Sequence, residues 1–495
     1  MMKVPNTDLN LLVLEVRDFL AQQRVDSYLI GGYVRDALLG RATKDIDIAV
    51  QASALEVAQQ VASFLGGRYV LLDERNKVAR VVMLEGDSPY ACRCYLDFST
   101  LRGDITQDLA QRDFTIDAMA VRLDEVAEDW SKLELIDPFG GQSDLRKGLI
   151  RQISSGVFYD DPARLLRAVR LAAEYSLAIE EKTEASICSS AHLITTVAGE
   201  RIREELRRLL SVPSAAYFLR YLDQLSLLEK IFPELAQTKG VRQPKEHFWD
   251  VFDHSMETVV ALERLLDFEK STDEILNSAP YLKTLAPHFE EEIGGMKRSS
   301  LAKLAALLHD IAKPKTKSIG EDGRTHFFGH AKEGAIIAGD ILTRLRFSGR
   351  EIKIVQKMIE YHLRPGQMSN EGLPTRRAIY RYFRDAGEVA IDTLLLGLAD
   401  HLATRGPNLD LDAWEEHTKL VGYILSRKEE SIIAPPKLID GHDLINLFGM
   451  KPGRQIGELL ELVREAQGAR EINTREEALA WVEMIIENES KTQAN

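Results

Sequence analysis

The sequence predicts an α+β head at the N-terminus, followed by a mostly α-helical chain. In the first 150 residues, short runs of apolar and β-branched side chains predict strands, with one helical pattern among them. After that point apolar residues recur at intervals of three and four, as in amphipathic helices. A chain of 495 residues is too long for a single core, so we expect about three or four domains.

The strands expected in the head follow from residue type. Each run is rich in the aliphatic and aromatic side chains that suit a pleated, half-buried surface. Between the second and third runs, apolar residues at helical spacing predict a helix from Ala52 to Leu65. The predicted strands are SYLI (27–30), DIDIAV (45–50), RYVLLD (68–73), ARVVML (79–84) and CRCYLDFST (92–100).

Proline, glycine and polar residues predict the boundaries of the helical part. Pro233, Pro244 and the run QTKGVRQPK between them indicate a linker near residue 240. Gly406-Pro407-Asn408 and Ala434-Pro435-Pro436 mark the start of a final helical piece. We therefore predict a head at 1–150, a helical neck at 151–240, a second helical domain at 241–410 and a helical tail at 411–495.

The composition excludes several classes of protein. With 45% hydrophobic and 28% charged residues, the chain is typical of folded globular proteins. No run approaches the roughly 20 apolar residues of a membrane helix, and the N-terminus lacks a secretory signal, so we expect a cytoplasmic protein that does not enter a membrane. Cys92, Cys94 and Cys188 are too few for a disulfide framework, and we expect reduced core residues.

The net charge of −14 argues against a nucleic-acid coat over the whole surface, because phosphate binding needs Lys and Arg. A local basic face is expected instead on the helix ERIREELRRLL, whose apolar residues form a stripe for burial. A solvated face carrying Glu204 and Glu205 ion pairs explains the same pattern. The basic residues are Arg201, Arg203, Arg207 and Arg208, and the apolar stripe is Ile202, Leu206 and Leu209.

Paired carboxylates follow a glycine turn in the head. Gly31 and Gly32 come directly after the strand SYLI and open a helix, where backbone amides can approach a phosphate, although an ordinary tight turn has the same appearance. Asp45 and Asp47 are two residues apart on a strand and therefore share one face. Two adjacent carboxylates favour a divalent cation, and Mg²⁺ accepts both carboxylate and phosphate oxygens. Asp97, on a later strand, is a candidate third carboxylate.

Five motifs in order resemble the bacterial class II family of CCA-adding tRNA nucleotidyltransferases and poly(A) polymerases. They are GGYVRD, DIDIAV, QRDFTIDAMA, DPFGG and DDPARLLRAVR, within about the first 210 residues. The resemblance implies a polymerase-β type of nucleotidyltransferase head that adds CMP or AMP to the 3′ end of tRNA from CTP and ATP. It also implies functional residues. Asp45 and Asp47 would hold Mg²⁺ beside Asp97, and the nucleotide would contact Gly31, Gly32, Arg35, Arg112, Asp113, Asp161, Arg164 and Arg167.

By this resemblance, Asp161 and Arg164 would select the base. We expect them at positions i and i+3 of one helix, where they present an acceptor beside a donor. Cytosine and adenine both offer an amino donor beside a ring-nitrogen acceptor, whereas uracil and guanine reverse that order. The pair would therefore accept C and A. A helical ion pair is the alternative interpretation.

Departures from the family pattern affect the expected product. Asp160 replaces the usual Glu, and Gln111 replaces the first Arg of its motif, while the residues assigned to the nucleotide remain. The span from Arg102 to Asp108 is shorter than the flexible loop associated in the family with switching to adenine. We therefore predict that the enzyme adds only part of CCA, either CC or the final A.

Histidines and aspartates in the second helical domain predict another metal site. Their order resembles that of the HD phosphohydrolase superfamily, and they lie in FDHSMETV, LLHDIAK, FFGHAKEGA, EYHLRP and LLLGLADH. Imidazole and carboxylate suit Mg²⁺, Mn²⁺, Ni²⁺ or another transition ion, which could activate water against a phosphate ester such as the 2′,3′-cyclic end of damaged RNA. Any one of these histidines alone could be structural. By the resemblance, His254, His309, Asp310 and Asp400 would hold one metal, with His330 and His362 serving a second metal or a phosphate.

The tail resembles that of HD-containing members of the same family, which implies tRNA binding, although packing between helices would explain the same residues. Its recognisable segments are 441–444, 452–457 and the helix start at 473–477. Other functions stay open for the whole chain. A poly(A) polymerase needs the same catalytic residues, and an HD phosphohydrolase could carry the head as a nucleotide sensor. The sequence does not fix the metal of the HD domain, its activity or the oligomeric state.

Overall fold

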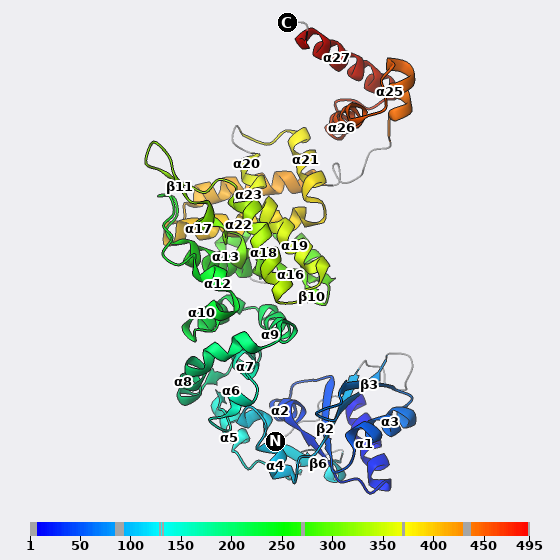
Figure 1. Ribbon diagram of the computed structural model, residues 1–495, viewed down its shortest axis with the longest axis vertical. Helices are drawn as coiled ribbons and strands as arrows, with labels where there is room; N and C mark the ends of the chain where they lie inside the picture. Colours follow the sequence, from blue (N-terminus) through cyan, green and yellow to red (C-terminus); the bar gives the residue numbers. More distant parts are fainter. Residues whose placement is uncertain are drawn as a thin grey trace. The chain divides into compact units, whose positions relative to one another are not determined.

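The computed structural model describes residues 7–84, 94–127, 130, 133–268, 273–368, 372–428 and 437–493 (Figure 1). They form two compact units. The first comprises residues 1–197 with 225–230, and the second comprises 198–224 with the chain from 231 onward. The predicted division at residues 150, 240 and 410 stays a prediction.

The first unit contains a six-stranded sheet with the order β3-β4-β5-β2-β1-β6. β2 and β5 pair in parallel, and the other neighbouring strands pair antiparallel. All five predicted strands are present, while β6 was not expected. The strands are β1 (Ser27–Ile30), β2 (Asp45–Val50), β3 (Arg68–Asp73), β4 (Val78–Met83), β5 (Cys94–Thr100) and β6 (Ala120–Arg122).

Helices accompany this sheet. α2 begins directly after β1, with Ile30 as its N-cap, and the left-handed backbone of Gly40 closes the helix after Leu39. α3 matches the predicted helix and packs against β3, β4 and β5. These helices are α1 (Thr7–Gln22), α2 (Gly31–Leu39), α3 (Ala54–Leu65) and α4 (Ile105–Leu109).

The rest of the first unit is mainly helical. A short parallel pair, β7 with β8, joins its segments. The α7 helix buries an apolar stripe that includes Leu165, Leu166 and Val169, as the spacing predicted. The elements are α5 (Gly141–Lys147), β7 (Leu149–Ile150), α6 (Val157–Asp160), α7 (Arg164–Tyr175), β8 (Ala178–Ile179) and α8 (Glu181–Ser190).

The second unit is almost entirely helical. α13, α16, α19 and α22 pack against one another at its centre, and α18 packs along α19. Two small hairpins, β9 with β10 and β11 with β12, interrupt the helices. Its elements up to residue 426 are α9 (Gly199–Ser211), α10 (Ala215–Gln224), α12 (Pro233–Ala236), α13 (Val251–Leu266), α14 (Glu274–Asn277), α15 (Ala286–Glu290), β9 (Glu292–Ile293), β10 (Met296–Lys297), α16 (Arg298–Leu308), α17 (Lys313–Thr316), β11 (Ser318–Ile319), β12 (Thr325–His326), α18 (His330–Arg344), α19 (Gly349–Tyr361), α20 (Arg364–Gln367), α21 (Arg376–Ala386), α22 (Ala390–Arg405) and α23 (Leu411–Ser426). The short helix α11 (Leu228–Ile231) precedes α12.

The basic helix α9 buries the predicted stripe of Ile202, Leu206 and Leu209. Its arginines make contacts within the protein. Arg203 Nη2 lies 3.3 Å from an oxygen of the buried Glu351, and Arg207 pairs with Glu204. The face is therefore partly occupied by ion pairs, and both interpretations of its basic residues stay open.

The tail has a small core of its own, which includes Leu444, Leu459, Val463 and Val482. Asp440 accepts hydrogen bonds from the amides of His442 and Asp443 and so caps the first tail helix. The predicted helix start at 473–477 is confirmed. The tail helices are α25 (Gly441–Phe448), α26 (Arg454–Gly468) and α27 (Arg475–Gln493).

Several smaller expectations have mixed outcomes. Cys94 is buried, but Cys188 is exposed, so its assignment to the core was wrong. Cys92 and the segment Ala434-Pro435-Pro436 lie outside the described residues. Across the described chain, no helix is both long enough and apolar enough to cross a membrane.

Candidate functional site

The Gly31-Gly32 turn lies beside the paired aspartates. Gly31 has φ +63°, a left-handed conformation that favours glycine. A Cβ at Gly31 would lie 3.5 Å from Asp47 Oδ2, and one at Gly32 would lie 3.7 Å from the same oxygen. The turn therefore leaves room for a ligand to approach the backbone next to a carboxylate.

Asp45 and Asp47 share one face of β2, as predicted. Ile46 and Ile48 point into the core and are fully buried, whereas Asp45 is exposed and Asp47 is half-buried. Asp97 lies on the adjacent strand β5, directly opposite Asp47 in the parallel register. The head thus brings the three predicted carboxylates to one part of the sheet.

The environment of Asp47 suits a cation. Burial raises the pKa of its carboxyl to about 6, and the neighbouring charge of Asp97 acts in the same direction, whereas Arg112 opposes the shift. A carboxylate that is costly to ionise beside another carboxylate gains from a bound divalent ion. The donor set of oxygen atoms matches the ligands that Mg²⁺ prefers.

Arg80 holds the third carboxylate. Its Nε and Nη2 donate to Asp97 Oδ1 and Oδ2, each at 2.7 Å, from the facing position on β4. Such two-point pairing fixes the orientation of a carboxylate. Sequence reasoning missed Arg80, because its partner is set by strand pairing and not by local spacing.

A cleft of about 310 Å³ opens beside these residues. It brings together four of the predicted site residues, Asp47, Asp97, Arg112 and Arg164. Arg164 Nη2 donates to the carbonyl of Gln111 at 2.9 Å, which holds this side chain at the cleft. We call this cavity the head cleft. The other predicted site residues, Gly31, Gly32, Arg35, Asp45, Asp113, Asp161 and Arg167, are not among its lining residues in the described chain.

Asp113 and Arg167 form a pair close to the cleft. Arg167 Nε lies 2.8 Å from Asp113 Oδ2, and its Nη2 lies 3.6 Å from the buried Asp117. Asp113 also accepts a hydrogen bond from the amide of Phe114. The two predicted residues therefore contact each other.

Arg35 is 5% exposed, and its guanidinium contacts Asp36, Asp117 and Tyr175. Its donors are therefore taken up inside the protein beside Gly32, and its contact with the nucleotide stays a prediction. We interpret Arg35 as a residue that braces α2. The partners Asp117 and Tyr175 lie far along the chain, so sequence spacing gave no signal of them.

Asp161 and Arg164 do not share one continuous helix, and that expectation was wrong. α6 ends at Asp160, Asp161 is extended with φ −150° and ψ 99°, and α7 begins at Arg164. The cause is Pro162, which disfavours helical backbone at the preceding residue. Asp161 instead receives a hydrogen bond from the amide of Ala163.

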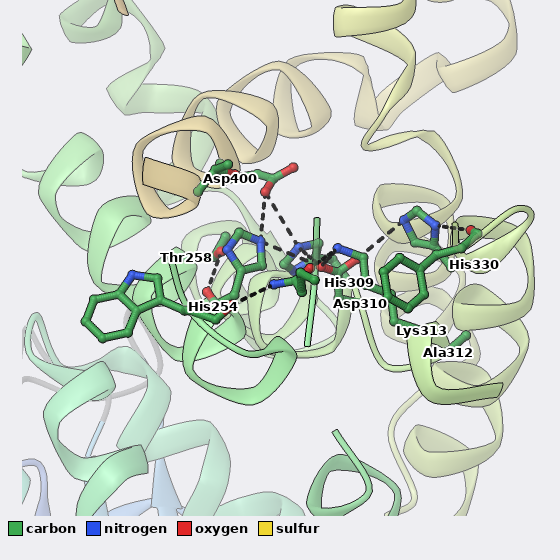
Figure 2. Close-up of polar contacts among 12 residues, drawn as sticks. His254, Thr258, His309, Asp310, Ala312, Lys313, His330 and Asp400 are labelled. Atoms are coloured by element: carbon green, nitrogen blue, oxygen red, sulfur yellow. Dashed lines mark hydrogen bonds and ion pairs between the residues drawn. The ribbon is translucent and has the colours of Figure 1, made fainter. Parts of the chain in front are cut away.

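The six predicted histidine and aspartate residues of the second unit converge: Figure 2 shows five of them together, and ligand atoms of His362 lie close to those of His309 and Asp310. We call them the HD cluster. His254 lies on α13, His309 and Asp310 follow α16, His330 begins α18, and Asp400 lies on α22. Figure 2 shows Asp400 and His254 facing each other across the site, with Asp310 between His309 and His330. The sixth residue, His362, follows the end of α19.

The distances within the HD cluster are those of a compact polar site. His254 Nε2 lies 2.9 Å from Asp400 Oδ1 and 3.6 Å from Asp310 Oδ2. His309 Nε2 lies 3.2 Å from Asp310 Oδ2, and His330 Nε2 lies 3.4 Å from Asp310 Oδ1. Two groups of residues have ligand atoms that all lie within 4.8 Å of one another. The first group is His254, His309 and Asp400, and the second is His309, Asp310 and His362, so His309 belongs to both.

Backbone contacts prepare three of the imidazoles to act as ligands. The Nδ1 atoms of His309, His330 and His362 lie 2.6–2.8 Å from the carbonyl oxygen three residues earlier. An Nδ1–H donated to a carbonyl leaves the lone pair of Nε2 free for a metal. Nε2 of His254, His309 and His330 is buried and has no hydrogen-bond partner among the described residues.

The charges in the HD cluster are strongly linked. Burial alone would raise the pKa of Asp310, but His309 and Lys313 lower it well below its ordinary value. Burial lowers the pKa of His362 to about 4, so this imidazole is neutral at physiological pH. Burial acts to lower the pKa of His309, but Asp310 and Asp400 raise it above its ordinary value. An anionic carboxylate beside a neutral imidazole such as His362 is part of the set that a transition metal requires. The residues therefore fit a divalent ion.

Lys313 contacts the HD cluster, and sequence reasoning missed it. Its Nζ lies 2.5 Å from Asp310 Oδ2 and donates to Gln243 Oε1. The spacing of three residues from Asp310 within HDIAK was an available signal. A cleft of about 780 Å³, which we call the HD cleft, is lined by Asp310, Lys313, His330, His362 and Asp400 together with surrounding residues.

Comparison with known proteins gives consistent matches along the chain. The family described as Poly A polymerase head domain matches residues 27–151. The probable RNA and SrmB-binding site of polymerase A matches 176–238, and the HD domain matches 251–405.

Curated relatives match nearly the whole chain. An A-adding tRNA nucleotidyltransferase of Deinococcus radiodurans is 32% identical over 93% of this chain and 95% of its own length. A CC-adding tRNA nucleotidyltransferase of Thermus thermophilus is 31% identical over 94% and 95%. Among solved structures, the Thermotoga maritima CCA-adding enzyme complexed with tRNA has 26% identity and a TM-score of 0.62, covering 98% of this chain and 96% of that one. A CCA-adding enzyme in complex with ATP has 25% identity and a TM-score of 0.64, covering 97% and 95%.

Proposed function

Because the chain belongs to the family of tRNA nucleotidyltransferases and poly(A) polymerases, we propose that it adds CMP or AMP to the 3′ end of tRNA. The observation that carries this proposal is the placement of Asp47 and Asp97 opposite each other at the head cleft, beside the Gly31-Gly32 turn. CTP, ATP and tRNA would be the ligands. The cytoplasm, where these substrates occur, would be the compartment.

Asp45 and Asp47 are the residues that would hold Mg²⁺, with Asp97 as the third carboxylate. When bound, the ion supplies positive charge that stabilises the triphosphate and the leaving pyrophosphate. The 3′ hydroxyl of the RNA would attack the α-phosphate at the head cleft. Arg112 and Arg164 line that cleft and would offset the charge that develops on the phosphates.

Base selection would use Asp161 and Arg164. A carboxylate accepts from the amino group of cytosine or adenine, and a guanidinium donates to the adjacent ring nitrogen. The extended backbone of Asp161 places its side chain just before α7, where it accepts a hydrogen bond from the amide of Ala163. Asp113 and Arg167, which pair with each other, would position the nucleotide. The amide of Phe114 donates to Asp113 and helps to hold this pair.

Partial addition, of CC or of the final A, is the product that we favour. The short segment from Arg102 to Asp108 is a closed turn, in which Asp104 and Gln107 form a capping box at the start of α4. Arg102 also donates to the side chains of Gln111 and Asn76. These hydrogen bonds hold the segment as a short turn, and relatives named for A addition or for CC addition match nearly the whole chain.

Incorporation from each of the four nucleoside triphosphates tests this function. The substrates are tRNAs that end before CCA, after the first C and after CC, and the products are sequenced at the 3′ end. CMP on the first two, or AMP on the third alone, is expected. Complete CCA on the first substrate would refute partial addition, and repeated AMP on any RNA would favour a poly(A) polymerase.

The second unit would act as a metal-dependent phosphohydrolase on a phosphate ester at an RNA end. The convergence of the HD cluster supports this activity, because the Nε2 atoms of His254, His309 and His330 point at carboxylate oxygens that could share a metal with them. His330 and His362 were predicted to serve a second metal or a phosphate. His362 lies beside His330, but its ligand atom also groups with those of His309 and Asp310. Hydrolysis of adenosine 2′,3′-cyclic phosphate by the purified full chain, tested with Mg²⁺, Mn²⁺ and Ni²⁺ in turn, is the direct assay. A head that served only as a nucleotide sensor would show no incorporation of any nucleotide.

The tail and the neck would contribute RNA contacts. The family model for an RNA-binding site covers residues 176–238, which include the basic helix α9. In the predicted domain division, the neck at 151–240 and the tail at 411–495 would bind RNA, while the head at 1–150 and the domain at 241–410 would carry the two activities. Measuring tRNA affinity after removal of residues 437–495 tests the assignment of the tail.

A further inference from the structure

The half-buried His326 on β12 and the exposed Phe328, which follows that strand, form an aromatic pair. His326 and Phe328 stack with their ring centroids 5.0 Å apart and their planes 11° from parallel. Phe328 is 79% exposed, more than any other large apolar side chain in the described chain. The β11–β12 hairpin projects at the edge of the second unit (Figure 1).

This pair lies at the HD cleft. His326 and Phe328 both line it, and Phe328 is two residues before His330 of the HD cluster. Gly329, with φ +79°, turns the chain from the hairpin into α18. A single exposed apolar residue is ordinary on a surface. A flat aromatic pair on the wall of a cleft that contains a candidate metal site is better explained by a ligand.

Cationic side chains line the same cleft. Lys313 and Arg364 line it, and Lys313 Nζ contacts Asp310 of the HD cluster. Arg364 pairs with Asp385 through one nitrogen at 3.0 Å. The cleft therefore offers cations and metal ligands for a phosphate at one place and an aromatic surface at another. A volume of about 780 Å³ suits a ligand larger than a free phosphate.

We propose that His326 and Phe328 form a platform on which the terminal base of an RNA or a mononucleotide stacks while its phosphate reaches the HD cluster. This proposal rests on the proposed phosphohydrolase function and adds the element that selects a nucleoside phosphate over other phosphate esters. Stacking on an aromatic face tolerates every base, so the platform would accept any 3′-terminal nucleotide.

Tryptophan fluorescence tests the platform independently of hydrolysis. Phe328→Trp keeps an aromatic surface at the cleft. Ile319→Trp is the matched control, because Ile319 is 72% exposed on the same hairpin but is not among the residues lining the HD cleft. Both full-length variants are titrated with adenosine 3′-monophosphate and with ribose 5-phosphate, and the wild-type signal is subtracted. Saturable quenching of Phe328→Trp by the nucleotide alone is expected. No quenching up to millimolar nucleotide, or equal quenching of Ile319→Trp, would overturn the platform.

Kinetics give the second measurement. Phe328→Ala should raise the KM for adenosine 2′,3′-cyclic phosphate about tenfold with little change in kcat, because a lost stacking contact weakens binding and leaves the metal ligands in place. Phe328→Tyr should restore the KM. An unchanged KM in Phe328→Ala contradicts the proposal. If the wild type hydrolyses no phosphate ester, the phosphohydrolase proposal fails, and the fluorescence titration still decides whether the platform binds a base.

Discussion

Asp47 and Asp97 lie directly opposite each other on the parallel strands β2 and β5. Arg80 binds Asp97 through two hydrogen bonds of 2.7 Å, whereas the positive charge of Arg112 lies near Asp47. Asp47 also faces the Gly31-Gly32 turn. The two carboxylates therefore differ in role: Asp47 is available to an ion, and Asp97 is fixed in position beside it.

The difference predicts unequal effects of substitution in the head. Asp47→Asn should abolish nucleotide incorporation, because it removes the charge that would hold the ion. Asp97→Asn should lower kcat by roughly 10–100-fold, as expected for a group that supports a metal ligand. Single-turnover incorporation of CMP or AMP measures both. Equal losses in the two variants would contradict the distinction.

Base discrimination should depend on Asp161. Asp161→Ala removes the acceptor for the amino group of C and A, so the preference of the enzyme for C and A over U and G should fall by about 1–3 kcal/mol, or roughly 5–150-fold. Ratios of kcat/KM for the four triphosphates provide the measurement. Arg164→Lys, which keeps the charge but loses the planar donor pair, should show a related loss. Unchanged ratios in both variants would rule out these residues as the selecting pair.

The HD cluster should be separable from nucleotide addition. The double variant His309→Ala/Asp310→Ala should lose bound metal, measured by elemental analysis, and phosphate ester hydrolysis, while incorporation of nucleotides into tRNA persists. Asp340→Ala, at an exposed aspartate of α18 that is not among the residues lining the HD cleft, is the control and should retain both activities. Hydrolysis that survives the double change would show that the cluster is not the hydrolytic site.

The packing of the tail against α21 should depend on pH. Glu465 is 5% exposed and pairs with Arg381 and Arg384. Burial alone would raise its pKa, but the two arginines lower it below the ordinary value of 4.5. A depressed folded pKa means that this stabilisation is present above pH 4.5 and is lost as the pH falls through the lower folded value.

Glu465→Gln should therefore weaken the contact between the tail and α21 by about 1–3 kcal/mol at neutral pH. The stability of this contact in the variant should no longer decrease when the solution is acidified. Hydrogen exchange of α26 at neutral pH and below pH 4.5 measures the effect. Glu458→Gln is the matched control, because Glu458 is 57% exposed and pairs with Arg454 on its own helix. The same acid sensitivity in Glu465→Gln and the wild type would contradict the assignment.

Local patterns in the sequence predicted much of the head. The alternation in DIDIAV placed Ile46 and Ile48 in the core and both aspartates on the other face, because side chains alternate along a strand. The helix break at Asp161 was missed although Pro162 signalled it. The exposed Cys188 was also missed, because a small residue on a polar helix can face solvent as readily as the core.

Contacts between distant segments were not predictable from spacing. Arg80 meets Asp97 through the pairing of two strands, and Arg35 meets Asp117 and Tyr175 through the packing of three elements. The residues of the HD cluster were found by their type and order, but the shared position of His309 in both ligand groups emerges only from the fold.

The most direct test of the account is incorporation by the full-length Asp45→Ala/Asp47→Ala variant on tRNA that lacks its 3′ CCA, with CTP and ATP supplied. The account predicts no added nucleotide, with tRNA binding and phosphate ester hydrolysis retained, while Asp73→Asn on strand β3 behaves like the wild type. Nucleotide addition at the wild-type rate by the double variant would contradict the assignment of the catalytic carboxylates.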